Sequence, residues 1–138
     1  MLAANRIAFK EWAAICHGLA AGEQHIILRK GGIHEGREGF RVQHAEFWLF
    51  PTQFHQADSD LNERGRAWLA EARRELPPAD TLAILHYVVV QRVTEITEPA
   101  TLPRLLGLHG WSDRVLDDRF NYRRPGLFAL TVRVYERS

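Results

Sequence analysis

One block of the chain, Gly31 to Gln56, crowds polar and aromatic side chains more densely than a core strand or a solvated loop requires. The block includes three of the seven histidines, three glutamates, two arginines, four phenylalanines and a tryptophan. Imidazole and carboxylate groups bind metals or transfer protons, guanidinium groups bind phosphate, and aromatic rings stack on bases. The block is therefore the segment best suited to a binding site, and three kinds of function remain open for it.

The first is binding of a nucleic acid, RNA or DNA, or of a nucleotide. Arg37 and Arg41 lie among glycines, which let backbone N–H groups approach a phosphate closely. Arg119 starts a second basic cluster near the end of the chain. We expect these three arginines to contact phosphate, and we expect Trp48 or Phe54 to stack on a base, which contributes ~1–3 kcal/mol.

The second function requires a divalent metal as cofactor. On a regular strand His44 and Glu46 point to the same side, and His55 follows just after a turn. Two histidines and one carboxylate suit zinc, iron(II) or manganese. These side chains would serve a metal-dependent hydrolase or nuclease, although the chain has no HExxH or CxxC spacing. If the ligand is instead a nucleic acid, the same three side chains would hydrogen-bond to the polar edges of a base.

A magnesium-dependent nuclease is a variant of the second function. Glu35, Glu38 and Glu46 would hold the ion, with Lys30 near the scissile phosphate. The third function is a protein-interaction module with no small ligand. In that case the aromatic residues are core and the arginines pair with nearby carboxylates.

We expect a cleft lined by residues 31–56 and 109–124. His109 and Trp111 would form one wall of it, or Trp111 would pack as a hydrophobic staple before the next helix. The candidate ligand-binding residues are Lys30, His34, Glu35, Arg37, Arg41, His44, Glu46, Trp48, Thr52, His55, His109, Trp111, Arg119 and Arg133, of which His44, Glu46 and His55 are the metal candidates.

Length and composition predict a single cytoplasmic domain spanning residues 1–138. A chain of 138 residues can bury one core, and its net charge of +1 gives no global field that would attract nucleic acid. Cys16 is the one cysteine, so no internal disulfide can form. No apolar run is long enough to span a membrane, and Lys10 and Glu11 interrupt any signal-peptide core.

Hydrophobic periodicity and turn residues predict the elements that position these side chains. The expected elements are a helix from about Asn5 to Ala21, a strand from His25 to Lys30, a glycine-punctuated loop from Ile33 to Arg41, a strand from Val42 to Phe50 closed by Pro51, a helix from Asp58 or Ser59 to about Leu76, a central buried strand from Leu82 to Ile96, short helices from Thr101 to Leu106 and from Ser112 or Asp113 to about Phe120, and a last strand from Leu127 to Glu136.

This order of elements predicts an α+β fold. Helices and strands alternate only in part, and no glycine-rich phosphate loop follows any strand. We expect a small, strongly curved mixed sheet or partial β-barrel with flanking helices.

Four sequence segments carry a resemblance that covers nearly the whole chain. They are FKEWAAIC at Phe9–Cys16, ILRKGGIHEG at Ile27–Gly36, EFWLFPTQFHQ at Glu46–Gln56, and the ending HGWSDRVLDDRF…LFALTVRVYE. With these segments the chain resembles an uncharacterised prokaryotic family known as domain of unknown function 1802. The resemblance implies one compact domain and offers no activity, substrate or catalytic residue.

The layout of the C-terminal half resembles a second group. A central strand, a helix that begins at a Trp-Ser step and a closing strand LTVRVYE are similar to the PUA-like barrels, which bind RNA or modified bases and include the ASCH and EVE branches. The chain has no diagnostic motif of those domains, so this likeness concerns the fold and does not establish function.

Overall fold

The computed structural model describes residues 6–30, 34–36, 39–41, 45–53, 57–75 and 84–137. Its elements are β1 (Ala8–Trp12), α1 (Ala13–Ala20), β2 (Ile26–Arg29), β3 (His34–Gly36), β4 (Gly39–Arg41), β5 (Glu46–Thr52), the short 3-10 helix η1 (Asp58–Asp60), α2 (Glu63–Arg74), β6 (His86–Ile96), the 3-10 helix η2 (Pro99–Leu105), α3 (Asp113–Asn121) and β7 (Leu127–Glu136). Among these helices, none is long and apolar enough to cross a membrane.

Five strands form one mixed sheet in the order β1-β5-β6-β7-β2. β1 runs parallel to β5, and the other neighbouring strands are antiparallel. β6 and β7 form a long central hairpin in which the register shifts between Val90 and Arg92. The α+β class and the mixed sheet are confirmed. The expected strong curvature is not: the sheet is neither closed into a barrel nor strongly curled, because its edge strands β1 and β2 do not pair with each other.

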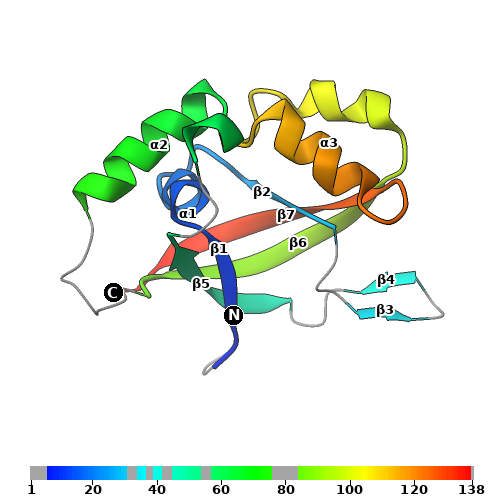
Figure 1. The fold of residues 1–138 in the computed structure, drawn as a ribbon. Coiled ribbons are helices and arrows are strands. Elements are labelled where there is room, and N and C mark those ends of the chain that lie inside the picture. The colour runs from blue at the N-terminus through cyan, green and yellow to red at the C-terminus, as the bar shows by residue number, and fades with distance from the viewer. Residues whose placement is uncertain are drawn as a thin grey trace.

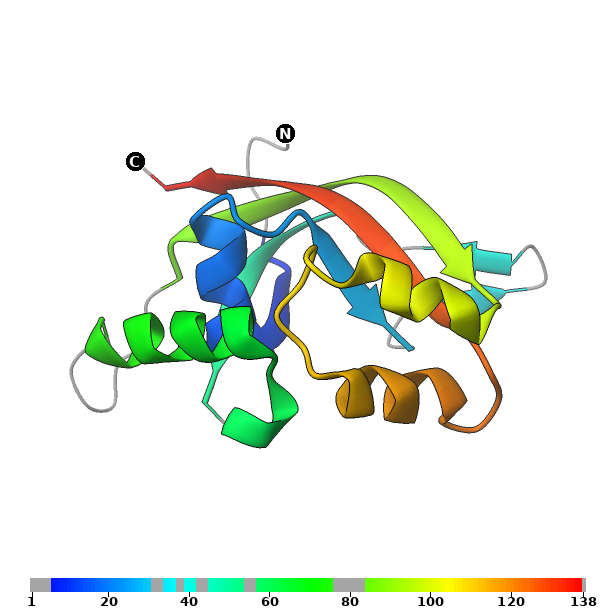
Figure 2. The ribbon, with the colours of Figure 1, turned by 90° about the horizontal axis from the view of Figure 1, so that it is seen from above.

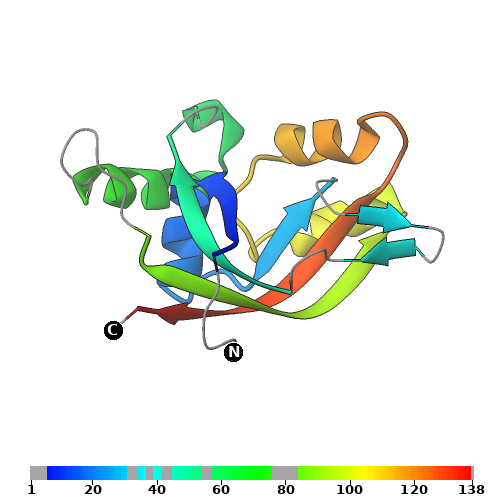
Figure 3. The same ribbon diagram turned by 90° about the horizontal axis from the view of Figure 1, so that it is seen from below.

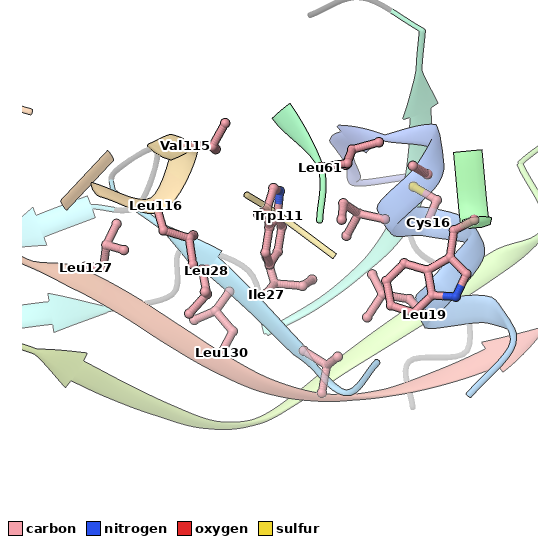
Figure 4. Packing of buried hydrophobic residues seen from close by; sticks show 14 of the residues in the cluster. Cys16, Leu19, Ile27, Leu28, Leu61, Trp111, Val115, Leu116, Leu127 and Leu130 are labelled. Atoms are coloured by element: carbon pink, nitrogen blue, oxygen red, sulfur yellow. The ribbon is translucent and has the colours of Figure 1, made fainter. Parts of the chain in front are cut away.

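The helices lie over one face of this sheet. Figure 2 shows α1 and α2 over one end and α3 with η2 over the other, and in Figure 3 the strands face the viewer with the helices behind them. Apolar side chains fill the layer between the helices and the sheet. The indole of Trp111 is fully buried at its centre and stands over Ile27 on β2 (Figure 4).

The β7 strand matches its prediction at both ends. Leu130 and Val132 are buried, whereas Thr131 and Arg133, which alternate with them, are exposed, as the sequence pattern indicates. β6 lies at the centre of the sheet, as predicted. The expectation that it is buried is wrong for its second half, because residues Gln91 to Glu95 are exposed. The helix predicted to start at Ser112 is also confirmed, since the Ser112 hydroxyl accepts a hydrogen bond from the N–H of Val115.

The predicted N-terminal helix is longer than the helix in the structure. Residues Ala8–Trp12 form a strand instead, and the helix begins at Ala13, after Trp12 with its extended backbone. The parallel pairing of β1 with β5 stabilises this strand. Phe9 and Trp12 fit a helical stripe by spacing, but aromatic residues also favour strands, and tertiary pairing decides between the two.

Other boundaries also differ from the prediction. Residues within 33–41, expected to form a loop, form the small hairpin β3-β4, which projects beyond one end of the main sheet (Figure 1). β5 continues through Pro51, which pairs in register with Glu11. α2 is capped by Asn62, whose side chain accepts from the N–H of Gly65, and not by Asp58 or Ser59.

Candidate ligand-binding site

Three charged side chains converge where β1, β2 and α3 meet. They are Glu11, Arg29 and Arg119, and they influence one another electrostatically. The half-buried guanidinium of Arg29 lies 3.9 Å from the centroid of the Phe9 ring. This contact joins the two edge strands of the sheet. We call these three residues the arginine–glutamate cluster.

Arg119 reaches the cluster from α3 and lies between two indoles. Its guanidinium carbon is 5.1 Å from the ring centroid of Trp12 and 5.3 Å from that of Trp111. Within the described part of the chain, its hydrogen bond runs from Nη1 to the carbonyl oxygen of Leu28 at 3.4 Å, which is long for such a bond. Most of its five N–H donors therefore remain for other partners.

Glu11 is the buried member of the cluster, with 4% of its surface exposed. Its Oε1 accepts a hydrogen bond from the backbone N–H of Trp12 at 2.9 Å. Its carbonyl oxygen accepts from the Thr52 hydroxyl at 3.2 Å and from the Cys16 thiol at 3.7 Å. These bonds fix the backbone of β1 beside β5 and α1, so the carboxylate is held in place.

The charges and the burial in the cluster oppose each other. Burial raises the pKa of Glu11, whereas the charge of Arg119, the Trp12 N–H and the charge of Arg29 lower it. Burial lowers the pKa of Arg29 and of Arg119, and the charge of Glu11 raises both. Two guanidinium groups and one carboxylate leave a surplus of one positive charge next to three aromatic rings. This arrangement suits an anion attached to a flat ring.

Three of the predicted site residues lie at this cluster. Arg119 is a member of it, Trp111 flanks Arg119, and Thr52 contacts the cluster through the carbonyl oxygen of Glu11. At this cluster the Gly31–Gln56 block and the 109–124 segment are therefore linked through β1, since Thr52 and Arg119 both act on Glu11.

Lys30 has a different environment from the one expected for a phosphate-binding lysine. Its ammonium group donates to the carbonyl oxygens of Phe120, Arg124 and Gly126. These carbonyls lie at and just after the C-terminal end of α3, where helix carbonyls lack intrahelical partners. Lys30 thus ties β2 to α3 and so holds Arg119 beside the cluster.

Glu46, Trp48 and Arg133 lie on the opposite side of the sheet from the cluster. Glu46 and Trp48 alternate along β5 with Phe47, which belongs to the helix-covered core. Both Glu46 and Arg133 pair in register with Val89 on the central strand. The ring of Trp48 packs edge-on against that of Tyr87, with centroids 5.0 Å apart.

His109 and Trp111 are core residues with 1% and 0% of their surfaces exposed. His109 Nδ1 accepts from the N–H of Trp111 at 3.1 Å. Burial lowers the pKa of His109 to about 4, with Asp113 opposing this effect and Arg64 adding to it, so the ring is neutral at pH 7. Trp111 also forms an isolated antiparallel bridge with Leu61. Its indole N–H is buried and has no hydrogen-bond acceptor among the described residues.

The other predicted site residues cannot be located as side chains. Arg37, His44 and His55 lie outside the described residues. For His34, Glu35 and Arg41 the structure gives only the backbone of the β3-β4 hairpin, where His34 pairs with Arg41. Within the described ranges, no group of three or more His, Cys, Asp and Glu residues is placed to hold a metal ion.

The sequence interpretation missed Glu11 as a site residue. This omission follows from the assignment of residues 5–21 to one helix. The segment Phe9 to Trp12 carries a signal that would have helped, because Phe9 and Glu11 share one face when the period is two. A carboxylate next to a core phenylalanine on that face requires a cationic partner elsewhere in the fold.

Comparisons with known proteins show which solved structures have a similar fold. No curated protein matches the chain. Among solved structures, the ASCH protein of Zymomonas mobilis matches with a TM-score of 0.54 and 11% identity, over 91% of this chain and 65% of that one. Its Y47F mutant matches with a TM-score of 0.52 and 12% identity, over 91% and 67%. The chain thus spans about two thirds of the length of these structures, and at this identity the likeness shows an ASCH-like, PUA-like fold alone.

A family model agrees with the sequence resemblance and covers almost all of the chain. It matches residues 8–138, a range that includes every member of the arginine–glutamate cluster. The chain belongs to the family described as Domain of unknown function (DUF1802).

Proposed function

We propose that this domain binds a nucleic acid or a nucleotide, with a phosphate held by Arg29 and Arg119. The observation that carries the proposal is the cluster itself, in which two half-buried guanidinium groups lie within electrostatic range of one carboxylate and each lies against an aromatic ring. Arginine presents its donors as a planar fork that fits phosphate oxygens.

Because they are partly buried, these arginines attract an anion more strongly than arginines on an open surface do. Coulombic attraction grows as the effective dielectric falls, from ~1 kcal/mol in bulk water to ~4 kcal/mol near a protein surface for unit charges 4 Å apart. The chain as a whole carries a net charge of only +1, so this local surplus, and not a global field, would select the anion.

An aromatic ring beside the phosphate site gives a place for a base. Trp12 is half-buried and flanks Arg119 at 5.1 Å, so part of its surface remains accessible. Stacking of a base on such a ring contributes about 1–3 kcal/mol and tolerates different bases. We include Arg37 and Arg41 in the proposal as further phosphate contacts for a longer nucleic-acid ligand.

The fold is consistent with this function without establishing it. The ASCH-like likeness is supported by the match to the Zymomonas mobilis structures, and the PUA-like group to which the layout is similar contains RNA-binding and modified-base-binding barrels. Because one fold hosts many functions, the support comes from the cluster.

Binding can be tested by fluorescence anisotropy with a labelled oligouridylate of about 12 nucleotides, at several salt concentrations. Wild-type protein should bind at low salt and lose affinity as salt rises. Arg119→Ala should weaken binding by about tenfold or more, which corresponds to ~1.4 kcal/mol. The matched control is Arg73→Ala, which removes an exposed arginine from α2. Equal loss in both variants, or no binding by wild type at low salt, would contradict the proposal.

A further inference from the structure

We propose that binding of an anion by Arg29 and Arg119 causes protonation of the Glu11 carboxylate, so that the protein takes up one proton together with the ligand. This inference rests on the proposed function and adds its regulation: a phosphate-bearing ligand binds more tightly as the pH falls.

The charge balance of the cluster leads to this inference. With Glu11 ionised, one of the two arginine charges is already neutralised and a single positive charge remains for the ligand. A phosphodiester brings a second negative charge to the same two arginines. Two negative charges at short range repel each other strongly in a buried setting, which raises the free energy of the complex. Protonation of Glu11 removes the conflict and leaves two positive charges for the phosphate.

The position of Glu11 makes it the group that responds. Only 4% of its surface is exposed, so water cannot screen its charge effectively. The elements around it present Arg29 from β2, Arg119 from α3 and the Cys16 thiol from α1, while Thr52 on β5 is neutral. From η1, the charge of Asp60 acts on Arg119.

The hydrogen bonds of Glu11 are compatible with either protonation state. The Trp12 N–H donates to Oε1, and a protonated carboxyl retains an acceptor oxygen for it. The bonds from Thr52 and Cys16 go to the backbone carbonyl, so they do not depend on the side-chain charge. Burial already raises the pKa of Glu11 in the free protein, and an anion nearby would raise it further.

The sign of the effect follows from this order of pKa values. Below the pKa of Glu11 in the free protein, the group is protonated before and after binding, and affinity does not depend on pH. As the pH rises from that pKa to the higher value in the complex, affinity falls, by about tenfold for each unit between the two. Above both values Glu11 is ionised in both states and affinity is again constant.

The first test measures proton uptake by the wild-type protein. Isothermal titration calorimetry with unlabelled oligouridylate, in buffers of different ionisation enthalpy, reports the number of protons bound with the ligand. Uridine and phosphodiester groups do not change charge between weakly acidic and neutral pH, so the protons belong to the protein. Uptake that is present in wild type and absent in Glu11→Gln would support the proposal.

The second test compares affinities across pH, with Glu98→Gln as the control. Both variants replace one carboxylate with an amide, but Glu98 is exposed and precedes η2. Glu11→Gln should bind more tightly than wild type at pH 7 and lose the part of the pH dependence that histidines do not account for. Thermal melting checks that both variants are folded.

The possible results separate this inference from the proposed function. If Arg119→Ala loses binding while wild type takes up no proton and Glu11→Gln binds no more tightly, ligand binding at the cluster stands and the proton coupling is wrong. If neither wild type nor Glu11→Gln binds oligouridylate at any pH, both proposals are wrong.

Discussion

The guanidinium of Arg29 lies over the ring of Phe9, 3.9 Å from its centroid, and so connects the two outer strands of the sheet, β2 and β1. Phe9 in turn stacks on Phe47 of the neighbouring strand, with ring centroids 4.7 Å apart. A charged side chain thus bridges strands that share no backbone hydrogen bonds. The same bridge places Arg29 within electrostatic range of Glu11 and Arg119.

Replacing Phe9 with leucine should destabilise the fold. The change removes the cation–π contact and the ring stacking but keeps an apolar side chain, so we expect a loss of about 1–2 kcal/mol in the free energy of unfolding. Urea unfolding measures this loss. Phe50→Leu is the control, since Phe50 is half-buried and its cation–π contact with Lys10 is longer, at 5.8 Å. An equal effect of the two changes would show that the Arg29 contact contributes nothing specific.

The stability of the wild-type protein should depend on the ionisation of Glu11. The pKa of Glu11 in the folded state lies above its ordinary value of 4.5. Between these two pKa values the folded state binds more protons than the unfolded state. The contribution of this group is fully present below pH 4.5 and is lost as the pH rises through the folded-state pKa.

The measurement for Glu11 is urea unfolding of wild type and Glu11→Gln across this pH range. The difference in unfolding free energy should shift in favour of Glu11→Gln as the pH rises, and then level off. A difference that stays constant across the range would mean that the carboxyl titrates alike in the folded and unfolded chains.

Lys30→Met should destabilise the protein through the end of α3. The substitution keeps the length of the side chain but leaves the carbonyls of Phe120, Arg124 and Gly126 without their ammonium donor. An unsatisfied, partly buried acceptor costs about 1–3 kcal/mol, and a change in unfolding free energy of that size is expected. The exposed Lys10 provides the control as Lys10→Met. If both variants unfold alike, the contacts of Lys30 are not stabilising.

Local sequence signals were sufficient to predict a secondary-structure element where the residues fit only one pattern. β7 alternates without ambiguity and was predicted from Leu127 to Glu136, as observed. Ser112 followed by Asp113 marks a helix start that depends only on neighbouring residues. In contrast, Phe9 and Trp12 fit both a helical stripe and a strand, and the choice depends on pairing with β5, about 40 residues away.

The candidate site depends on contacts that sequence spacing does not encode. Arg119 was identified from its basic neighbourhood, but its partners Glu11 and Arg29 come from opposite edges of the sheet. Trp111 illustrates the reverse case. It was a candidate wall of a pocket, with a hydrophobic staple before the next helix as the alternative, and its complete burial places it in the core and not at an open wall.

The most direct test follows the indole N–H signals of the four tryptophans by ¹H–¹⁵N NMR while oligouridylate is added. Binding at the arginine–glutamate cluster predicts that the signal of Trp12, and that of Trp111 through Arg119, shift in a saturable manner, while the signal of Trp68 in the α2 core stays in place. Shifts confined to Trp48, on the opposite side of the sheet, or no shift at all at saturating ligand, would contradict the account.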